Sequence, residues 1–173
     1  MSALKYLNIS DYKTQNGRTT DISLSYQTFG PTLGKAPVVL VIHALTGNSN
    51  VIGEKGWWND LIGENKCIDT QKYTVLAFNI PGNGYDNKSE NLIDNYRDFI
   101  ARDIADIFSL GLEQLKIDKL FAAIGGSVGG GTMGSETGGS FCSTLVRTRS
   151  RSGRGKSTGV SAESSSSFSS KTN

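Results

Sequence analysis

The chain has 173 residues, which is enough for one domain with a substantial core, and its 18 basic and 16 acidic side chains give a formal net charge of +2. Its two cysteines, Cys67 and Cys142, exclude a disulfide framework and do not have the spacing of a metal site, so no bound metal is expected. Because the first residues lack the apolar stretch of a signal peptide and no run approaches 18 apolar residues, the sequence predicts a soluble, cytoplasmic protein without a membrane segment.

Two strands are predicted at the start of the chain, over residues 4–9 and 22–29. The second alternates apolar and polar side chains with a period of two, which is typical of a strand with one buried face. The dipeptide Asn16-Gly17 lies between them and favours a tight turn. The two segments therefore predict an antiparallel hairpin.

Two further strands are predicted over residues 38–42 and 73–80. The first consists of five consecutive apolar residues, four of them β-branched, which is typical of a strand buried on both faces in a parallel sheet. Between the two strands, residues 56–63 predict a short helical turn closed by Gly63. The tryptophans Trp57 and Trp58 in that turn are interpreted as packing residues.

One long helix is predicted next. Six apolar residues lie on one stripe along it, and Asn95, followed by Asp98, is a plausible N-cap arrangement. Asp103 and Asp106 lie off the stripe and are expected on the solvated face. The stripe consists of Ile100, Ile104, Ile107, Phe108, Leu112 and Leu115.

A last apolar run, residues 120–124, ends in the pattern G-x-S-x-G at residues 125–129. In this pattern a serine occupies a sharp strand-to-helix turn that exposes its hydroxyl above the sheet. Ser127 is therefore a candidate nucleophile. The order of elements (hairpin, strand, short helix, strand, long helix, strand) predicts an α/β domain with a mainly parallel sheet.

The composition changes after residue 131. Residues 1–131 hold 12 basic and 14 acidic side chains, whereas residues 132–173 hold 6 basic and 2 acidic side chains and 13 serines. Such a segment buries too little apolar area to offset its chain entropy, so a basic, disordered tail is predicted over 132–173. Residues 151–158 resemble a phosphate loop but fail its pattern, because Ser150 stands where the first glycine belongs. Nucleic-acid binding is not favoured.

Several motifs in order resemble those of the homoserine O-acetyltransferases, a family of the α/β-hydrolase superfamily. They are the segment from Val38 to Gly47 (Val-Val-Leu-Val-Ile-His-Ala-Leu-Thr-Gly), Gly56-Trp57-Trp58, Ile68-Asp69-Thr70, and the segment from Ile124 to Gly130 (Ile-Gly-Gly-Ser-Val-Gly-Gly). The resemblance covers residues 1–131 and implies a truncated α/β-hydrolase fold that ends at the nucleophile elbow. The loop 79–85 departs from the Gly-Gly-Cys-Tyr form associated with many members.

The resemblance implies acyl transfer through a serine acyl-enzyme. Ser127 would take the acetyl group of acetyl-CoA and pass it to the hydroxyl of L-homoserine, a reaction of methionine biosynthesis. The backbone amides of Leu45 and Val128 would form the oxyanion hole, and substrate contacts are expected from Thr46, Gly47 and Asn48. Acetyl-CoA would be a co-substrate without any resident cofactor or metal. The partners would be small molecules, with a homodimer as one arrangement of the intact family member.

A complete Ser-His-Asp triad is not found in these 173 residues. His43 is the only histidine and precedes Ser127, whereas the superfamily order places the histidine last. His43 is therefore expected to shape the oxyanion loop, and the chain alone is expected to be an inactive fragment with an unrelated tail. The alternatives are another α/β-hydrolase activity (an esterase or a homoserine O-succinyltransferase) or a non-catalytic fragment whose one independent property is its basic tail.

Overall fold

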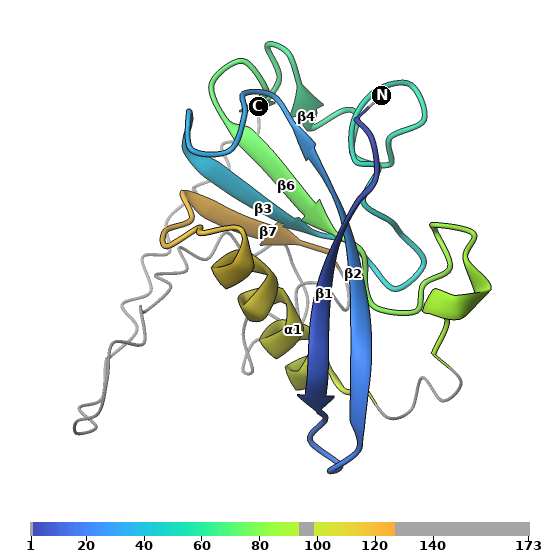
Figure 1. The fold of residues 1–173 in the computed structure, drawn as a ribbon. Helices are drawn as coiled ribbons and strands as arrows, with labels where there is room; N and C mark the ends of the chain where they lie inside the picture. Colours follow the sequence, from blue (N-terminus) through green and yellow to red (C-terminus); the bar gives the residue numbers. More distant parts are fainter. Residues whose placement is uncertain (1, 94–98, 127–173) are drawn as a thin grey trace, which may run out of the picture.

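The structure is a computed structural model that describes residues 2–93 and 99–126. Its main feature is a five-stranded sheet with the order β1-β2-β6-β3-β7, crossed on one face by the helix α1 (Figure 1). A separate pair, β4 and β5, lies in the connection between β3 and β6, and a short 3-10 helix η1 follows β6. The elements are β1 (Lys5–Lys13), β2 (Thr19–Phe29), β3 (Val38–Ile42), β4 (Ile62–Gly63), β5 (Ile68–Asp69), β6 (Thr74–Phe78), η1 (Ser89–Asn91), α1 (Ala101–Gln114) and β7 (Ala122–Gly125).

The predicted hairpin is present and is longer than the sequence pattern indicated. β1 and β2 pair antiparallel, and Gly17 between them has a φ of +89°, which glycine adopts without strain. The pairing shifts between Ile9 and Tyr12, where Asp11 has a φ of +53°. This irregularity interrupts the period-two pattern, and for that reason the pattern alone ended the first strand at residue 9.

The centre of the sheet is parallel, as predicted. β3 pairs in parallel with β6 on one side and with β7 on the other, while β2 joins β6 antiparallel. In this register Ile42, Phe78 and Gly125 lie side by side at the carboxyl ends of their strands. The residues that follow these three strands therefore meet at one edge of the sheet.

Two apolar clusters cover the two faces of the sheet, which explains why β3 is apolar at every position and β6 at every position after Thr74. On the α1 face, alternate residues of β3 and β6 pack against the helix stripe. On the opposite face, Val41, Val75 and Ala77 pack against the connection that contains β4 and β5. The α1 cluster includes Leu24, Leu40, Ile42, Leu76, Phe78, Ile104, Ile107, Phe108 and Leu112.

Helix α1 approaches the sheet closely at Gly111. A Cβ at this position would lie 2.7 Å from Leu24 Cδ2 and 2.9 Å from Phe78 Cζ, and both of those side chains are completely buried. The helix begins at Ala101, with Ile100 as its N-cap. The proposed cap residue Asn95 lies outside the described residues.

The prediction that Asp103 lies on the solvated face of the helix is wrong. It is completely buried and accepts hydrogen bonds from the Tyr12 hydroxyl (3.0 Å), the Gln15 N–H (2.9 Å) and the Ile100 N–H (3.0 Å). Burial, followed by the contact with Asp103, raises the pKa of Tyr12. Asp106 is exposed, as predicted. Asp103 therefore joins the end of the hairpin to the first turn of α1.

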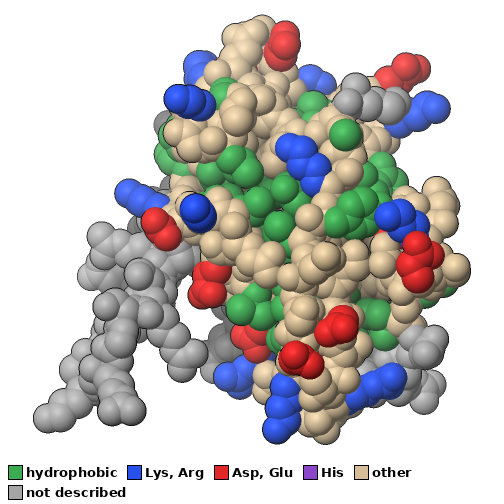
Figure 2. Space-filling view, in the orientation of Figure 1, with side chains coloured by type: hydrophobic (Ala, Val, Ile, Leu, Met, Phe, Trp, Pro, Cys, Tyr) green, Lys and Arg blue, Asp and Glu red, His purple; other side chains and the backbone are tan. Residues whose placement is uncertain are grey.

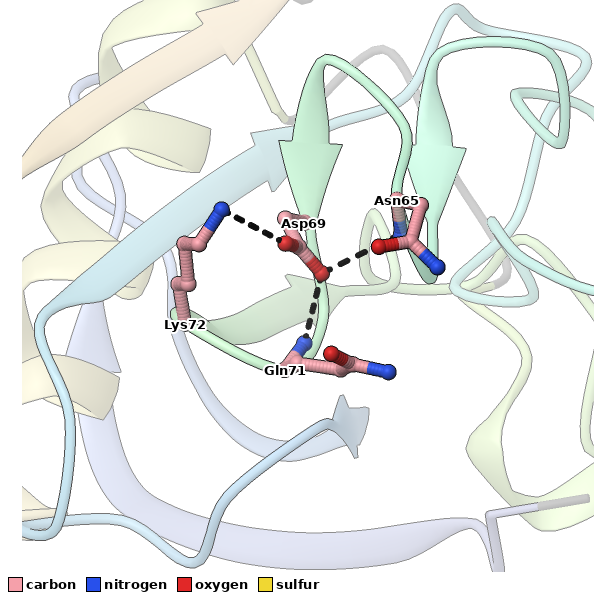
Figure 3. Close-up of polar contacts among 4 residues, drawn as sticks. All are labelled: Asn65, Asp69, Gln71 and Lys72. Carbon is pink, nitrogen blue, oxygen red and sulfur yellow. Dashed lines mark hydrogen bonds and ion pairs between the residues drawn. The ribbon is translucent and has the colours of Figure 1, made fainter.

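The short helical turn predicted for residues 56–63 is present in part. Residues 57–61 form turns, and the Ile62 N–H donates to the Trp58 carbonyl oxygen (2.9 Å), as in one turn of a helix. Gly63 lies in β4, which pairs in parallel with β5. Asp69 at the end of β5 accepts from the N–H groups of Gln71 (3.0 Å) and Asn65 (3.3 Å) and pairs with Lys72 (3.0 Å; Figure 3). The Gln71 amide first, then Lys72, lowers the pKa of Asp69.

Within residues 2–93 and 99–126, no helix has the length and apolar character needed to cross a membrane. The same residues contain no group of three or more His, Cys, Asp or Glu side chains that could hold a metal ion. Figure 2 shows basic and acidic side chains interspersed over one face of the molecule. Cys67 is exposed with a free thiol, and the predicted tail, including Cys142, lies outside the described residues.

Candidate functional site

The candidate site lies where β3, β6 and β7 end together. Because Ile42, Phe78 and Gly125 are neighbours in the sheet, the next residues along the chain (His43, Asn79 and Gly126) follow at the same edge. This edge is where ligands bind in open α/β sheets. Ser127 and Val128 lie outside the described residues, so their roles as nucleophile and oxyanion donor remain predictions.

His43 is buried, with 1% of its surface exposed, and both ring nitrogens are engaged. Nε2 lies 3.1 Å from the Ile80 N–H, and Nδ1 lies 2.6 Å from the Ala44 carbonyl oxygen. Because the amide can only donate and the carbonyl can only accept, this arrangement assigns the neutral ring with its proton on Nδ1. Burial lowers the pKa of His43, with the Ala44 bond acting in the opposite direction. A ring held in this way has no free nitrogen for a general base and fits the expected role in shaping the loop.

The loop after β3 turns sharply beside His43. The Gly47 N–H donates to the Ala44 carbonyl oxygen (2.8 Å), which closes a turn with Leu45 and Thr46 at its tip. A Cβ on Gly47 would lie 2.9 Å from His43 Cβ, so the loop packs tightly against the ring. Leu45 is 65% exposed, and no hydrogen bond to its N–H is found among the described residues. A main-chain N–H at this tip that has no intramolecular acceptor in the part of the chain that the structure describes is available to donate to an oxyanion.

The other predicted substrate contacts lie on the same loop. Thr46 is exposed and Gly47 is partly buried. The side-chain oxygen of Asn48 accepts from the Asn50 N–H (2.9 Å), and its carbonyl oxygen accepts from Trp57 Nε1 (2.7 Å). Asn48 therefore contributes to the shape of the loop in this structure, while Thr46 at the tip has its side chain open to solvent.

The tandem tryptophans pack, as interpreted from the sequence. Their ring centroids lie 4.5 Å apart, and both rings contact the apolar cluster opposite α1. A Cβ on Gly126 would lie 3.4 Å from Trp58 Cζ2. Trp57 thus holds the loop after β3, and Trp58 lies against the residue that precedes Ser127.

Sequence reasoning missed a buried polar cluster beneath the loop, formed by Ser25, Gln27, Ser49 and Asn79. The Asn79 side chain bonds both serines, and the Ser49 hydroxyl donates to Gln27 Oε1 (2.7 Å). The four residues are each 7% exposed or less. One signal was present in the sequence: Asn79 is a polar residue directly after the apolar run 75–78.

Comparisons with known proteins agree with this geometry. Residues 37–134 match the family profile described as alpha/beta hydrolase fold. The chain is 38% identical over 133 residues to the homoserine O-acetyltransferase of Methanococcus vannielii, covering 67% of this chain and 27% of that enzyme.

Two solved structures are similar as well. The homoserine O-acetyltransferase of Staphylococcus aureus superimposes with a TM-score of 0.64 at 28% identity, covering 76% of this chain and 41% of that one. Esterase E22 superimposes with a TM-score of 0.62 at 25% identity, covering 75% and 42%. The chain spans well under half the length of these relatives. The family profile, over residues 37–134, covers more than half of the chain, and the chain therefore belongs to the α/β-hydrolase fold family.

Proposed function

We propose that this chain carries the nucleophile-bearing part of an acyltransferase of the homoserine O-acetyltransferase type. The observation that carries the proposal is the register of β3, β6 and β7. It brings the start of the loop that contains Leu45 to the same edge of the sheet as Gly126, the residue before Ser127. The names of the similar enzymes support transfer of an acetyl group to homoserine, and acetyl-CoA as the donor is what the resemblance to this family implies.

The proposed reaction has two half-reactions. The Ser127 hydroxyl attacks the thioester carbonyl of acetyl-CoA, a general base takes its proton, and the CoA thiol leaves with a proton as the acetyl-serine ester forms. The homoserine hydroxyl then attacks this ester, which gives O-acetylhomoserine and regenerates the serine. In each tetrahedral intermediate the Leu45 and Val128 amides donate to the negative oxygen, and one such donor contributes about 2.7–4 kcal/mol.

The proposal places the general base outside these 173 residues. His43 is the one histidine of the chain, and both of its nitrogens are engaged in the structure. The purified chain is therefore expected to show no acetyl-CoA-dependent acetylation of homoserine above a Ser127→Ala control.

A chimera tests the activity itself. Residues 1–131 of this chain would replace the matching part of the Methanococcus vannielii enzyme, and O-acetylhomoserine formation would be followed with acetyl-CoA and L-homoserine. The proposal expects turnover that Ser127→Ala abolishes, with a burst of CoA release in the absence of homoserine. A folded chimera without such turnover contradicts it.

Ester hydrolysis is the second candidate, favoured by the likeness to esterase E22. Fold does not fix the acyl acceptor, because water and a hydroxyl can attack the same acyl-enzyme. The same chimera assayed with p-nitrophenyl acetate, and with succinyl-CoA in place of acetyl-CoA, separates hydrolysis and succinyl transfer from acetyl transfer.

The remaining parts of the proposal follow from this reaction. Acetyl-CoA acts as a co-substrate with no resident cofactor, the substrates are small molecules, and the location is cytoplasmic. A homodimer is proposed for the intact protein, and light scattering of the active chimera measures its oligomeric state.

Residues 132–173 are proposed to lie outside the hydrolase domain. Limited proteolysis of the chain tests this boundary, with a stable product ending near residue 131 as the expected result.

A further inference from the structure

We propose that Asn79 is a positioning residue that fixes the loop 43–49 and thereby the Leu45 amide. The inference rests on the proposed function, because the loop matters for catalysis only if that amide stabilises an oxyanion. No substrate contact is assigned to Asn79 itself, and it acts through Ser49.

The Asn79 side chain uses its full hydrogen-bonding capacity. Its Nδ2 donates to the hydroxyls of Ser25 (2.9 Å) and Ser49 (3.0 Å). Its Oδ1 accepts from the Ser49 N–H (2.7 Å) and from Asn83 Nδ2 (3.1 Å). A primary amide has two N–H donors and an oxygen with two lone pairs, so no further bond is left to make. Aspartate cannot donate these bonds, and an apolar residue can neither donate nor accept them.

Two adjacent residues hold both ends of the loop. Asn79 binds Ser49, the last residue of the segment, through its main-chain N–H and its hydroxyl. The N–H of the next residue, Ile80, donates to the ring of His43, the first residue of the segment. Because Asn79 follows β6 directly, the position of the loop is set by the central strands of the sheet.

The cluster is buried, so water cannot replace these bonds. Asn79 is 1% exposed and Ser49 is completely buried, while the Leu45 side chain at the tip is 65% exposed. Gln27 of β2 accepts from the Ser49 hydroxyl and adds a second strand to the support. The tip can therefore face a substrate while its base is held in one geometry, which is what a preorganised donor requires.

Amide hydrogen exchange on the full 173-residue chain tests the physical part of the inference. In Asn79→Ala, exchange of the Ser49 N–H is expected to accelerate on the order of tenfold or more, while the Leu24 N–H in β2 stays protected. Retained protection at Ser49 overturns the inference. If the Leu24 N–H loses its protection too, the Asn79→Ala variant has unfolded. The comparison of Ser25→Ala with Ser49→Ala then tests the inference.

Two serines provide a matched pair of substitutions. Ser25→Ala and Ser49→Ala each remove one buried hydroxyl that accepts from Asn79 Nδ2, but only Ser49 lies on the loop. Ser49→Ala is expected to change the chemical shifts of the Leu45 and Thr46 amides, and Ser25→Ala is expected to leave them in place. Equal effects of the two substitutions overturn the inference.

Kinetics of the chimera test the catalytic part, with rates normalised to active sites counted from the burst. Asn79→Ala is expected to lower kcat about 100-fold at a nearly unchanged KM, because a misplaced donor weakens mainly the transition state. Ser49→Ala should lower kcat less, Ser25→Ala should lower it least of the three, and the pH profile should not move. An unchanged kcat in both Asn79→Ala and Ser49→Ala overturns the inference. An inactive wild-type chimera contradicts the proposed function, and the exchange data then decide whether Asn79 holds the loop.

Discussion

Two buried polar side chains, Asn79 and Asp103, join distant segments at two different places in the molecule. Asn79 is neutral, follows β6 and binds the loop of the candidate site through four hydrogen bonds. Asp103 is a carboxylate at the start of α1 and accepts from Ile100 and from the end of the hairpin. Each lies beside a turn that apolar packing alone would leave free to move.

The two side chains differ in the hydrogen bonds that they can make and in the segments that they hold. Asn79 both donates and accepts, so it fixes a loop whose tip carries no apolar anchor in the core. Asp103 only accepts, and it holds together two elements that already share an apolar cluster. Loss of Asp103 should therefore be felt mainly as stability, and loss of Asn79 mainly as the geometry of the site.

Replacement of Asp103 by alanine is the strongest test of this contrast. It leaves the buried Tyr12 hydroxyl and the N–H groups of the exposed residues Gln15 and Ile100 without their acceptor. The free energy of unfolding is expected to fall by about 3 kcal/mol, because three hydrogen bonds of about 1 kcal/mol each are lost. Urea denaturation followed by circular dichroism measures the loss.

The matched control for Asp103 is Tyr12→Phe, which removes one of these bonds and should cost about 1 kcal/mol. Hydrogen exchange of the Ser49 N–H should be unchanged in both variants. An acceleration at Ser49 as large as the one expected in Asn79→Ala would show that the two regions are not separate.

Substitution of Gly111 by alanine probes the packing of α1 on the sheet. The new methyl group would meet Leu24 and Phe78, which are completely buried and cannot swing aside. Overpacking should lower the free energy of unfolding by about 1–3 kcal/mol, which outweighs the gain in helix propensity of about 1 kcal/mol. Ser109→Ala, at an exposed position of the same helix, should be neutral or slightly stabilising in the same urea titration. A stabilised Gly111→Ala would refute the close contact.

A smaller effect on the free energy of unfolding is expected from pH, through His43 in the loop of the candidate site. Burial lowers the pKa of His43 from its ordinary value of 6.5, so below pH 6.5 the unfolded chain binds a proton that the folded chain does not. The stabilisation is complete above pH 6.5 and is lost as the pH falls through the lowered pKa. Urea denaturation at pH 8 and pH 5 measures the change. In His43→Gln the free energy of unfolding should depend less on pH. An equal change between pH 8 and pH 5 in both proteins would contradict a lowered pKa of His43.

The smallest effect concerns Asp69, which belongs to neither region. Lys72→Met removes a largely exposed partner, so the pKa of Asp69 should rise toward its ordinary 3.8 but stay below it, because the Gln71 and Asn65 amides remain. The stability that Asp69 contributes is present above pH 3.8 and is lost as the pH falls through the lowered value. NMR titration of the Asp69 carboxyl carbon measures the shift, and a pKa above 3.8 in Lys72→Met would be the contrary result.

The sheet could be predicted from the sequence because its signal is local. A run of five apolar residues at 38–42 can lie only between two covered faces, and the Asn16-Gly17 turn fixed the hairpin before it. The G-x-S-x-G pattern after the last strand located the candidate nucleophile. The order of the triad in the superfamily argued against His43 as the base, and the burial and bonds of that ring agree.

Long-range polar contacts could not be predicted in this way. Asp103 reads as a solvated helix residue because its partners Tyr12 and Gln15 lie about 90 positions earlier in the chain. Asn79 reads as a strand end because nothing local indicates that Ser25 and Ser49 surround it. Hydrophobic periodicity reports burial of apolar faces, and it contains no information about which polar groups pair across the fold.

The central position of β3 has an evolutionary consequence. Side chains alternate between the two faces of a strand, so inserting or deleting one residue within Val38–Ile42 would exchange the sets that face α1 and the opposite cluster, and would turn His43 away from Ile80. Conservative exchanges of one apolar residue for another should survive selection there, whereas changes of length should not. In descendants of this gene, length variation should accumulate instead in exposed turns such as residues 64–67, between β4 and β5.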